Sequence, residues 1–310
     1  MQVRRLERLE PLGWGSPCVA VGNFDGVHLG HQALLREVVA QARTRGDWPV
    51  GLTFDPHPAR VLRPERAPVA LLTFEQKARL LAHAGLRGLA VLPFDAALAA
   101  LTPDEFAARV LRDALGARLV AVGENFRFGT GRAGGVADLR RLGEELGFEL
   151  LALGPVAWGG GAVSSTRVRE ALLLGQVEQA GALLGRPYAV EGPVVAGDRR
   201  GRTLGFPTAN VNPWNELLPL AGVYAARCSG PDGQSREAVV NVGRRPTFDG
   251  REVRLEAHLL DFEGDLYGLP LRVDFVARLR DEMRFPSAQA LVERIRADAE
   301  AARRVLERAG

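Results

Sequence analysis

Apolar runs rich in β-branched residues alternate with helix-like stretches along the first half of the chain. The apolar runs occupy 18–24, 50–54, 89–94, 118–123 and 148–155. Between them lie stretches whose apolar residues recur every three to four positions, at 31–46, 73–85, 102–116 and 136–147. This alternation predicts an α/β fold in which helices cover both faces of a parallel, Rossmann-like sheet. Ligands of such sheets bind at the carboxyl ends of the strands, where we expect a site.

The helix-like stretches also carry start and stop signals. Thr102 is a predicted N-cap, Pro103 follows at the first helical position, and Gly116 ends the pattern. Thr73 and Gly85 bound another stretch in the same way.

The second half of the chain has a different pattern. Short β-type segments are separated by Gly, Pro and Asp, and they occupy 222–230, 237–243, 253–262 and 271–279. This spacing predicts a small antiparallel β-barrel, followed by an amphipathic helix over about 287–308. We therefore expect two domains, 1–185 and 186–310.

Composition excludes several classes of protein. The net charge is +3, from 40 basic and 37 acidic residues, which is too balanced for a nucleic-acid coat. The chain shows no apolar run long enough to span a bilayer and no signal-peptide core at its N-terminus. Cys18 and Cys228 lie in apolar runs without metal-type spacing, so we expect them to be core residues of a cytoplasmic protein.

Lysine is almost absent from the sequence. The one lysine, Lys77, lies inside the helix-like stretch 73–85, which excludes a P-loop ending in Gly-Lys-Ser/Thr. Any phosphate chemistry must therefore use backbone amides, arginine, histidine or a metal ion.

The stretch "GNFDGVHLGH" follows the first predicted strand and opens the next helix. Amide groups at a helix start attract anions, and His28 and His31, three positions apart, share a face toward that site. Gly30 lets a ligand approach the backbone, and imidazoles can stabilise a phosphoryl group that gains charge. Two other roles stay open: capping the helix, or binding zinc with His57 as a third ligand.

Motifs along almost the whole chain resemble those of the prokaryotic bifunctional riboflavin kinase/FAD synthetase family. In the first half these are "GNFDGVHLGH", "TFDPHP", "GENFRFG" and "VSSTRVREAL"; in the second half they are "GRTLGFPTANV", "GVYA", "NVGRRPTF" and "EAHLLDFEGDLYG". The resemblance implies an adenylyltransferase domain followed by a riboflavin kinase domain.

For the adenylyltransferase, the resemblance implies that His28 and His31 are catalytic. It places ATP on Gly22, Asn23, Phe24, Asp25, Gly30, Ser165, Thr166 and Arg169. It places the flavin beside Phe54, Asn125, Phe126 and Phe128. The serines can instead be simple helix caps, and the phenylalanines of 124–128 can instead anchor their loop in the core.

For the kinase, "AGDRRGRTLGFPTAN" supplies glycines that can cradle phosphates with backbone amides. The predicted ATP contacts are Gly197, Arg202, Thr203, Gly205, Thr208 and Asn210. Thr208 and Asn210 offer oxygen ligands suited to Mg²⁺, although the same residues also favour an ordinary turn. Glu256 would be a surface residue by default, and the resemblance makes it the base for the riboflavin 5′-hydroxyl.

The expected function is therefore the phosphorylation of riboflavin to FMN by ATP, followed by adenylylation of FMN to FAD with release of pyrophosphate. Both steps would require Mg²⁺. The expected partners are the small-molecule substrates riboflavin, FMN and ATP, with no nucleic acid and no membrane, and the sequence leaves the oligomeric state open. Two alternatives remain: an adenylyltransferase whose second domain only senses flavin, and a non-enzymatic flavin or nucleic-acid regulator.

Overall fold

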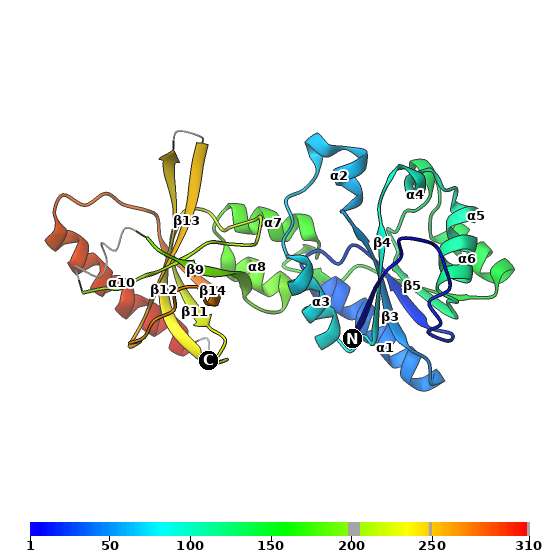
Figure 1. Cartoon of the computed structure of the whole chain (residues 1–310), viewed down its shortest axis with the longest axis horizontal. Helices are drawn as coiled ribbons and strands as arrows, with labels where there is room; N and C mark the ends of the chain where they lie inside the picture. The colour runs from blue at the N-terminus through cyan, green and yellow to red at the C-terminus, as the bar shows by residue number, and fades with distance from the viewer. Residues whose placement is uncertain (198–204, 248–249, 309–310) are drawn as a thin grey trace. The chain divides into compact units, whose positions relative to one another are not determined.

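Two compact units make up the chain, Met1–Val163 and Ser164–Gly310 (Figure 1). The computed structural model describes residues 1–197, 205–247 and 250–308, and at 244–247 and 250–253 it describes the backbone alone. α7 (Ser165–Leu173) and α8 (Val177–Leu184) belong to the second unit, whereas the sequence-based boundary assigns them to the first domain. The boundary at 185/186 stays a prediction.

The sheet of the first unit contains six parallel strands in the order β1-β4-β3-β2-β5-β6. The five predicted strands are confirmed, and β1 is an addition at the edge. Their bounds are β1 (Gln2–Arg5), β2 (Cys18–Val21), β3 (Pro49–Asp55), β4 (Gly88–Pro93), β5 (Leu119–Gly123) and β6 (Glu149–Leu153).

Helices connect these strands, and their ends follow the predicted signals. Thr73 and Thr102 each form a capping box, with Gln76 and Glu105 respectively. The predicted helix 102–116 is α-helical only in its first turn and then widens into a π-type stretch, in which the Leu115 amide donates to the Val110 carbonyl. The elements are α1 (Leu29–Arg45), α2 (Pro58–Leu62), η1 (Pro64–Arg66), α3 (Phe74–His83), α4 (Ala96–Ala100), α5 (Pro103–Phe106), η2 (Ala107–Ala114), η3 (Thr130–Arg132) and α6 (Val136–Leu146).

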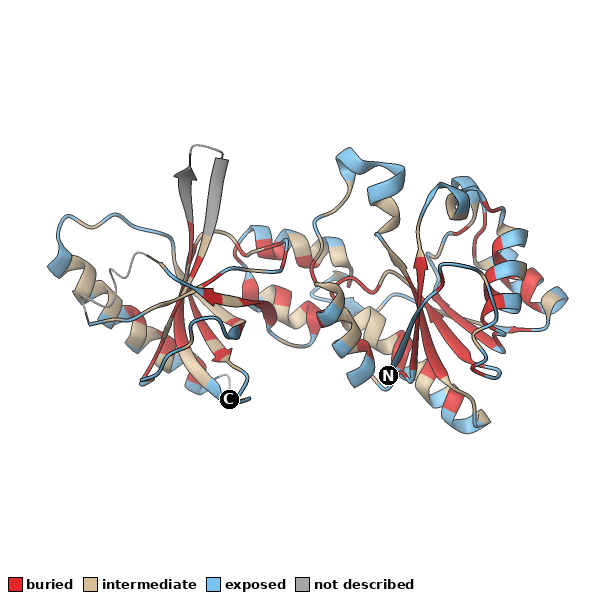
Figure 2. Cartoon of the chain, viewed as in Figure 1, coloured by how far each residue is buried: buried red, intermediate tan, exposed pale blue. Residues whose placement is uncertain are grey.

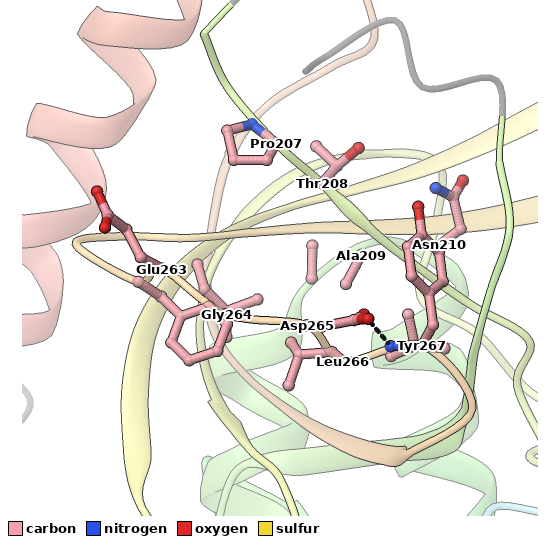
Figure 3. A pocket seen from close by; sticks show the side chains of 13 residues that line it. Pro207, Thr208, Ala209, Asn210, Glu263, Gly264, Asp265, Leu266 and Tyr267 are labelled. Carbon is pink, nitrogen blue, oxygen red and sulfur yellow. Dashed lines mark hydrogen bonds between the residues drawn. The ribbon is translucent and has the colours of Figure 1, made fainter.

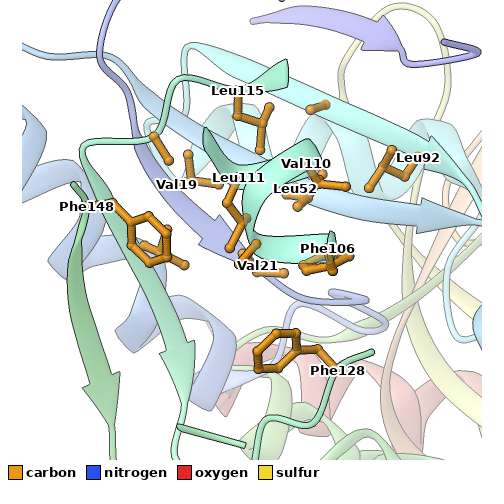
Figure 4. Close-up of a cluster of buried hydrophobic side chains, with 14 of the residues drawn as sticks. Val19, Val21, Leu52, Leu92, Phe106, Val110, Leu111, Leu115, Phe128 and Phe148 are labelled. Carbon is orange, nitrogen blue, oxygen red and sulfur yellow. The ribbon is translucent and has the colours of Figure 1, made fainter. Parts of the chain in front are cut away.

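The η2 segment seals one face of the sheet. Its apolar side chains pack on residues of the central strands in a single buried cluster (Figure 4). Phe128 from the loop after β5 and Phe148 before β6 close this cluster. The members drawn and labelled are Val19, Val21, Leu52, Leu92, Phe106, Val110, Leu111, Leu115, Phe128 and Phe148.

The second unit contains the predicted antiparallel barrel, closed in the order β10-β13-β12-β11-β14-β9. The barrel follows α7 and α8, and a short hairpin of β7 (Ala157–Trp158) and β8 (Gly161–Ala162) precedes them. Figure 2 shows burial concentrated along the barrel strands, as along those of the sheet. The barrel strands are β9 (Tyr188–Val195), β10 (Ala209–Val211), β11 (Gly222–Ser229), β12 (Ser235–Thr247), β13 (Gly250–Leu259) and β14 (Pro270–Arg280).

The C-terminal helix α10 (Ala288–Arg308) covers the outside of the barrel. Its Ala302 and Leu306 are fully buried against a cluster that includes Val223, Val239 and Leu260. Within the described parts of the chain, no helix combines the length and apolar character needed to cross a membrane. Cys18 and Cys228 are both buried and free.

Candidate active sites

The chain connections of the parallel sheet reverse direction between β2 and β5. From β2 the chain continues to β3 on one side, while β5 lies against the other side of β2. The loops that follow these two strands are 22–28 and 124–128, which hold two of the predicted motifs. Because ligands of open parallel sheets bind at such a reversal, the topology supports a ligand site at these loops.

His28 is the N-cap of α1, and His31 lies in its first turn. The Nδ1 of His28 accepts a hydrogen bond of 3.4 Å from the His31 amide, and the two rings stack with centroids 3.7 Å apart. An accepting nitrogen carries no proton, so neutral His28 has its proton on Nε2. A Cβ at Gly30 would lie 3.1 Å from the His28 ring, so glycine leaves this imidazole undisturbed.

His31 is held in its neutral form. Burial lowers its pKa well below the ordinary value, and the neighbouring His28 and Lys77 lower it further. Its Nδ1 is buried and has no hydrogen-bond partner, and the Phe24 ring meets it at 5.4 Å between centroids. An unpaired buried nitrogen at a helix start is a place where a phosphate oxygen can serve as partner.

The loop between β2 and α1 turns its side chains inward. Phe24 and Val27 have positive φ angles of 49° and 41°, and Phe24 is fully buried. The buried carboxylate of Asp25 accepts from the Leu71 amide at 3.0 Å, which ties the loop to the segment before α3. A nucleotide contact by Phe24 or Asp25 would therefore involve the backbone, and this role stays a prediction.

Asn23 and His57 form a pair beside this loop. The side-chain nitrogen of Asn23 lies 3.2 Å from His57 Nε2, and His57 Nδ1 accepts from the Ala59 amide at 3.1 Å to cap α2. Both ring nitrogens of His57 are thus engaged locally. Within residues 1–197, 205–247 and 250–308, no group of three or more His, Cys, Asp or Glu side chains is placed to hold a metal ion.

The two phenylalanines of the 124–128 loop have different environments. Phe128 is 5% exposed, stacks on Phe126 with centroids 5.7 Å apart, and contacts Phe106 at the same separation. Phe126 is half-buried and Asn125 is exposed. Phe128 therefore anchors the loop in the core, and Asn125 and Phe126 remain the more accessible flavin candidates. Phe54, also half-buried, packs edge-on against Phe94 at 5.9 Å.

The start of α7 holds the predicted "SSTRVR" motif. Ser164 is the N-cap, and its Oγ accepts from the Arg167 amide at 3.3 Å. Ser165 and Arg169 are half-buried, and Thr166 is exposed. The amide groups at this helix start, together with the arginines, favour an anion.

In the barrel, strand pairing brings two predicted kinase residues, Asn210 and Glu256, close to each other. Asn210 on β10 lies directly opposite Glu256 on β13, and Asn241 on β12 lies opposite Glu256 on its other side. Along β13, Leu255, Ala257 and Leu259 are buried, and Glu256 and His258 between them are half-buried.

A cavity of about 460 Å³ lies beside this pairing (Figure 3). Thr208 and Asn210 line it, as do Ala257 and Leu259 of β13. The wall also includes a loop to which the sequence motifs assigned no role, where Asp265 accepts from the Tyr267 amide at 2.9 Å. The remaining lining residues are Val194, Pro207, Ala209, Phe262, Glu263, Gly264 and Leu266.

The glycines of the predicted phosphate loop have distinct roles. A Cβ at Gly197 would lie 2.3 Å from the Asn210 side chain, so glycine is required there for Asn210 to keep its place. Gly205 has a φ of 84°, which favours glycine by conformation. The predicted contacts Arg202 and Thr203 lie outside the described residues.

Comparisons with known proteins match each half of the chain separately. The family model for FAD synthetase matches residues 14–167, and the one for riboflavin kinase matches residues 184–306. A bifunctional riboflavin kinase/FMN adenylyltransferase of Pseudomonas fluorescens is 42% identical over 303 residues, covering 97% of this chain and 96% of that protein. The protein of the same name from Escherichia coli K12 is 40% identical over 282 residues, covering 91% and 90%.

A solved structure also superposes on the whole chain. The crystal structure of a macrolide-efflux protein from Streptococcus pneumoniae matches with a TM-score of 0.91 and 34% identity, covering 98% of this chain and 99% of that one.

Proposed function

Because the chain belongs to the family of bifunctional riboflavin kinase/FMN adenylyltransferases, we propose how its residues divide the synthesis of FAD. The C-terminal half is the riboflavin kinase, which transfers the γ-phosphoryl group of ATP to riboflavin and yields FMN. The N-terminal half is the FMN adenylyltransferase, which joins the AMP part of a second ATP to FMN and releases pyrophosphate. Family membership thus favours two enzymatic activities over a flavin sensor or a nucleic-acid regulator.

In the adenylyltransferase, His28 and His31 are proposed to stabilise the phosphoryl group under attack. An FMN phosphate oxygen bonds to the α-phosphorus of ATP while the bond from that phosphorus to pyrophosphate breaks. The Nε2–H of His28 donates to an α-phosphate oxygen as charge builds there. A phosphate oxygen also supplies the partner that the buried Nδ1 of His31 lacks within the protein.

The remaining ATP contacts are proposed on two backbone segments. Gly22, Asn23, Phe24, Asp25 and Gly30 offer main-chain groups around the start of α1. Ser165, Thr166 and Arg169 at the start of α7 bind phosphate oxygens through hydroxyls and positive charge. Phe54, Asn125 and Phe126 contact the flavin, while Phe128 supports their loop from the core.

In the kinase, Glu256 is proposed to accept the proton of the riboflavin 5′-hydroxyl as its oxygen attacks the γ-phosphorus and ADP leaves. Thr208 and Asn210 offer hydroxyl and amide oxygens at a cavity wall, a donor set that fits Mg²⁺. An Mg²⁺ ion held by these two residues would neutralise negative charge on the phosphates of ATP. Gly197, Arg202, Thr203 and Gly205 are proposed to complete the phosphate loop.

We also infer that the enzyme works in the cytoplasm without a nucleic-acid partner. The two cysteines are free and buried, which fits a reducing compartment. The charge is nearly balanced, at +3.

The observation that carries the proposal is the separation of the two sets of site residues, one after β2 and one on β10 and β13. The test is to incubate the purified chain with riboflavin and MgATP and to follow FMN and FAD by chromatography. Glu256→Gln should lower riboflavin phosphorylation by roughly a hundredfold or more. It should leave FAD formation from supplied FMN unchanged.

His28→Ala should impair FAD formation and leave the phosphorylation of riboflavin unchanged. FMN should accumulate, because losing one donor to the transition state slows adenylylation by about a hundred- to thousandfold. Near-normal FAD synthesis by His28→Ala would overturn the role of His28, and near-normal kinase activity of Glu256→Gln would overturn that of Glu256.

A further inference from the structure

His258 ties the segment that precedes β10 to β13. Its Nδ1 lies 2.8 Å from the carbonyl oxygen of Pro207, and its ring meets the Phe206 ring edge-on with centroids 5.5 Å apart. A carbonyl oxygen can only accept, so the proton of this bond lies on Nδ1. Nδ1 donates in both the neutral and the charged imidazole, so the bond does not depend on the charge of the ring.

The pairing between β10 and β13 ends at Ala209, the residue that follows Thr208. Ala209 pairs with Ala257, and Asn210 pairs with Glu256. Continuing this register places position 208 opposite 258. Pro207 has no amide hydrogen to extend the ladder. The bond from His258 to the Pro207 carbonyl therefore takes the place of a ladder bond beside Thr208.

We propose that His258 is a positioning residue of the riboflavin kinase and that it acts through Thr208. Pro207 and Thr208 both line the cavity. On β13, the residues before and after His258, Ala257 and Leu259, also line it. By holding the Pro207 carbonyl, His258 sets where the Thr208 oxygen lies. The inference rests on the proposed role of Thr208 toward MgATP.

Two substitutions at position 258 distinguish the contribution of the hydrogen bond from that of the imidazole ring itself. His258→Ala removes the donor, and His258→Asn keeps an N–H group close to the position of Nδ1. His258→Ala should raise the KM for MgATP and lower kinase kcat/KM by about tenfold to a hundredfold, the usual cost of misplacing a reacting group. His258→Asn should recover most of this loss.

The pH dependence of kinase turnover distinguishes positioning from proton transfer. Both variants should keep the wild-type shape of the profile, because the bond does not depend on the charge of the ring. Loss of activity in His258→Asn equal to that in His258→Ala, with one limb of the profile removed, would make His258 a base and overturn the proposal. FAD formation from supplied FMN should be unchanged in every variant.

A double-mutant cycle with Thr208→Ala completes the test. Because His258 acts through Thr208, adding His258→Ala to Thr208→Ala should cause little further loss. Fully additive losses would overturn the positioning role. Wild-type kinetics of His258→Ala beside an impaired Thr208→Ala would refute this inference alone, whereas wild-type kinetics of Thr208→Ala would refute the proposed role of Thr208.

Discussion

At the scale of single residues, the lowered pKa of His31 links the stability of the first unit to pH. Its pKa is lowered by burial and by the neighbouring His28 and Lys77, so the folded state binds its proton less readily than the unfolded chain, where the pKa is about 6.5. As pH falls below about 6.5, the unfolded state gains a proton first and the stability of the fold decreases. One such group costs at most about 1.4 kcal/mol per pH unit in this window.

We therefore expect His31→Gln to lose less stability than the wild type between pH 7.5 and pH 5.5, measured as the change in urea unfolding free energy. His83→Gln, at an exposed position of α3, is the matched control and should retain the wild-type loss. An equal acid loss in His31→Gln and the wild type would contradict the lowered pKa of His31.

Side-chain roles within the motifs could be predicted from spacing only in part. The interval of three residues gave the contact between His28 and His31, because the start of a helix makes that distance local. Phe128, and not Phe126, is the buried anchor of the loop, and this depends on the β-bridge between Phe128 and Gly134. Local sequence spacing does not reveal that pairing. The inward turn of Phe24 depends on a positive φ that a non-glycine residue rarely adopts.

At the scale of elements, α10 is held on the barrel by a buried carboxylate. Asp298 is 2% exposed and accepts hydrogen bonds from Arg280 on β14, the shortest at 2.6 Å, while Arg294 lies 3.0 Å away. Asp298→Asn keeps the shape and removes the charge, which leaves Arg280, whose side chain is only 13% exposed, without its counter-ion. The change should cost about 3–5 kcal/mol of unfolding free energy for the second unit, measured by urea denaturation.

Asp261→Asn is the control for this prediction. Asp261 pairs with Arg303 of the same helix at 2.7 Å, but its side chain is 76% exposed, so about 0–1 kcal/mol should be lost. Similar losses in the two variants would show that the buried pair does not hold α10 in place.

Most elements could be predicted because their signals are local. The capping boxes at Thr73 and Thr102 and the β-branched apolar runs lie within a few residues of the elements they define. β10 has only three residues, and its place comes from pairing with β9 and β13, which are distant in sequence. β1 carries no apolar alternation, and nothing in the sequence indicated the π-type stretch of η2.

At the scale of the molecule, α7 and α8 decide where the kinase can be separated from the rest. α8 has four buried apolar residues, and its Glu178 accepts from the Arg278 amide of β14 at 3.1 Å. The Leu220 amide donates to the Leu172 carbonyl of α7 at 2.9 Å. A fragment of 164–310 should therefore unfold at a temperature higher by roughly 10 °C than a fragment of 186–310, since each kcal/mol shifts the midpoint by several degrees.

Both fragments should phosphorylate riboflavin at temperatures where they are folded, because Thr208, Asn210 and Glu256 lie in the part they share. Calorimetry gives the two unfolding midpoints, and chromatography of FMN gives the activity. Equal midpoints would show that α7 and α8 add nothing to the barrel and would favour the boundary at 185/186.

The edge strand β1 also covers the edge of the sheet, where a strand of another protein molecule could otherwise pair. Its four residues are exposed and pair in parallel with β4, whose interior positions are all buried. Without β1, the apolar β4 would present unpaired amides and carbonyls, a template on which another chain can add a strand. Arg4 and Arg5 place positive charge on the new edge, and like charges discourage two copies from joining there. We therefore expect these four residues, which take no part in either active site, to lower the tendency of the sheet to aggregate.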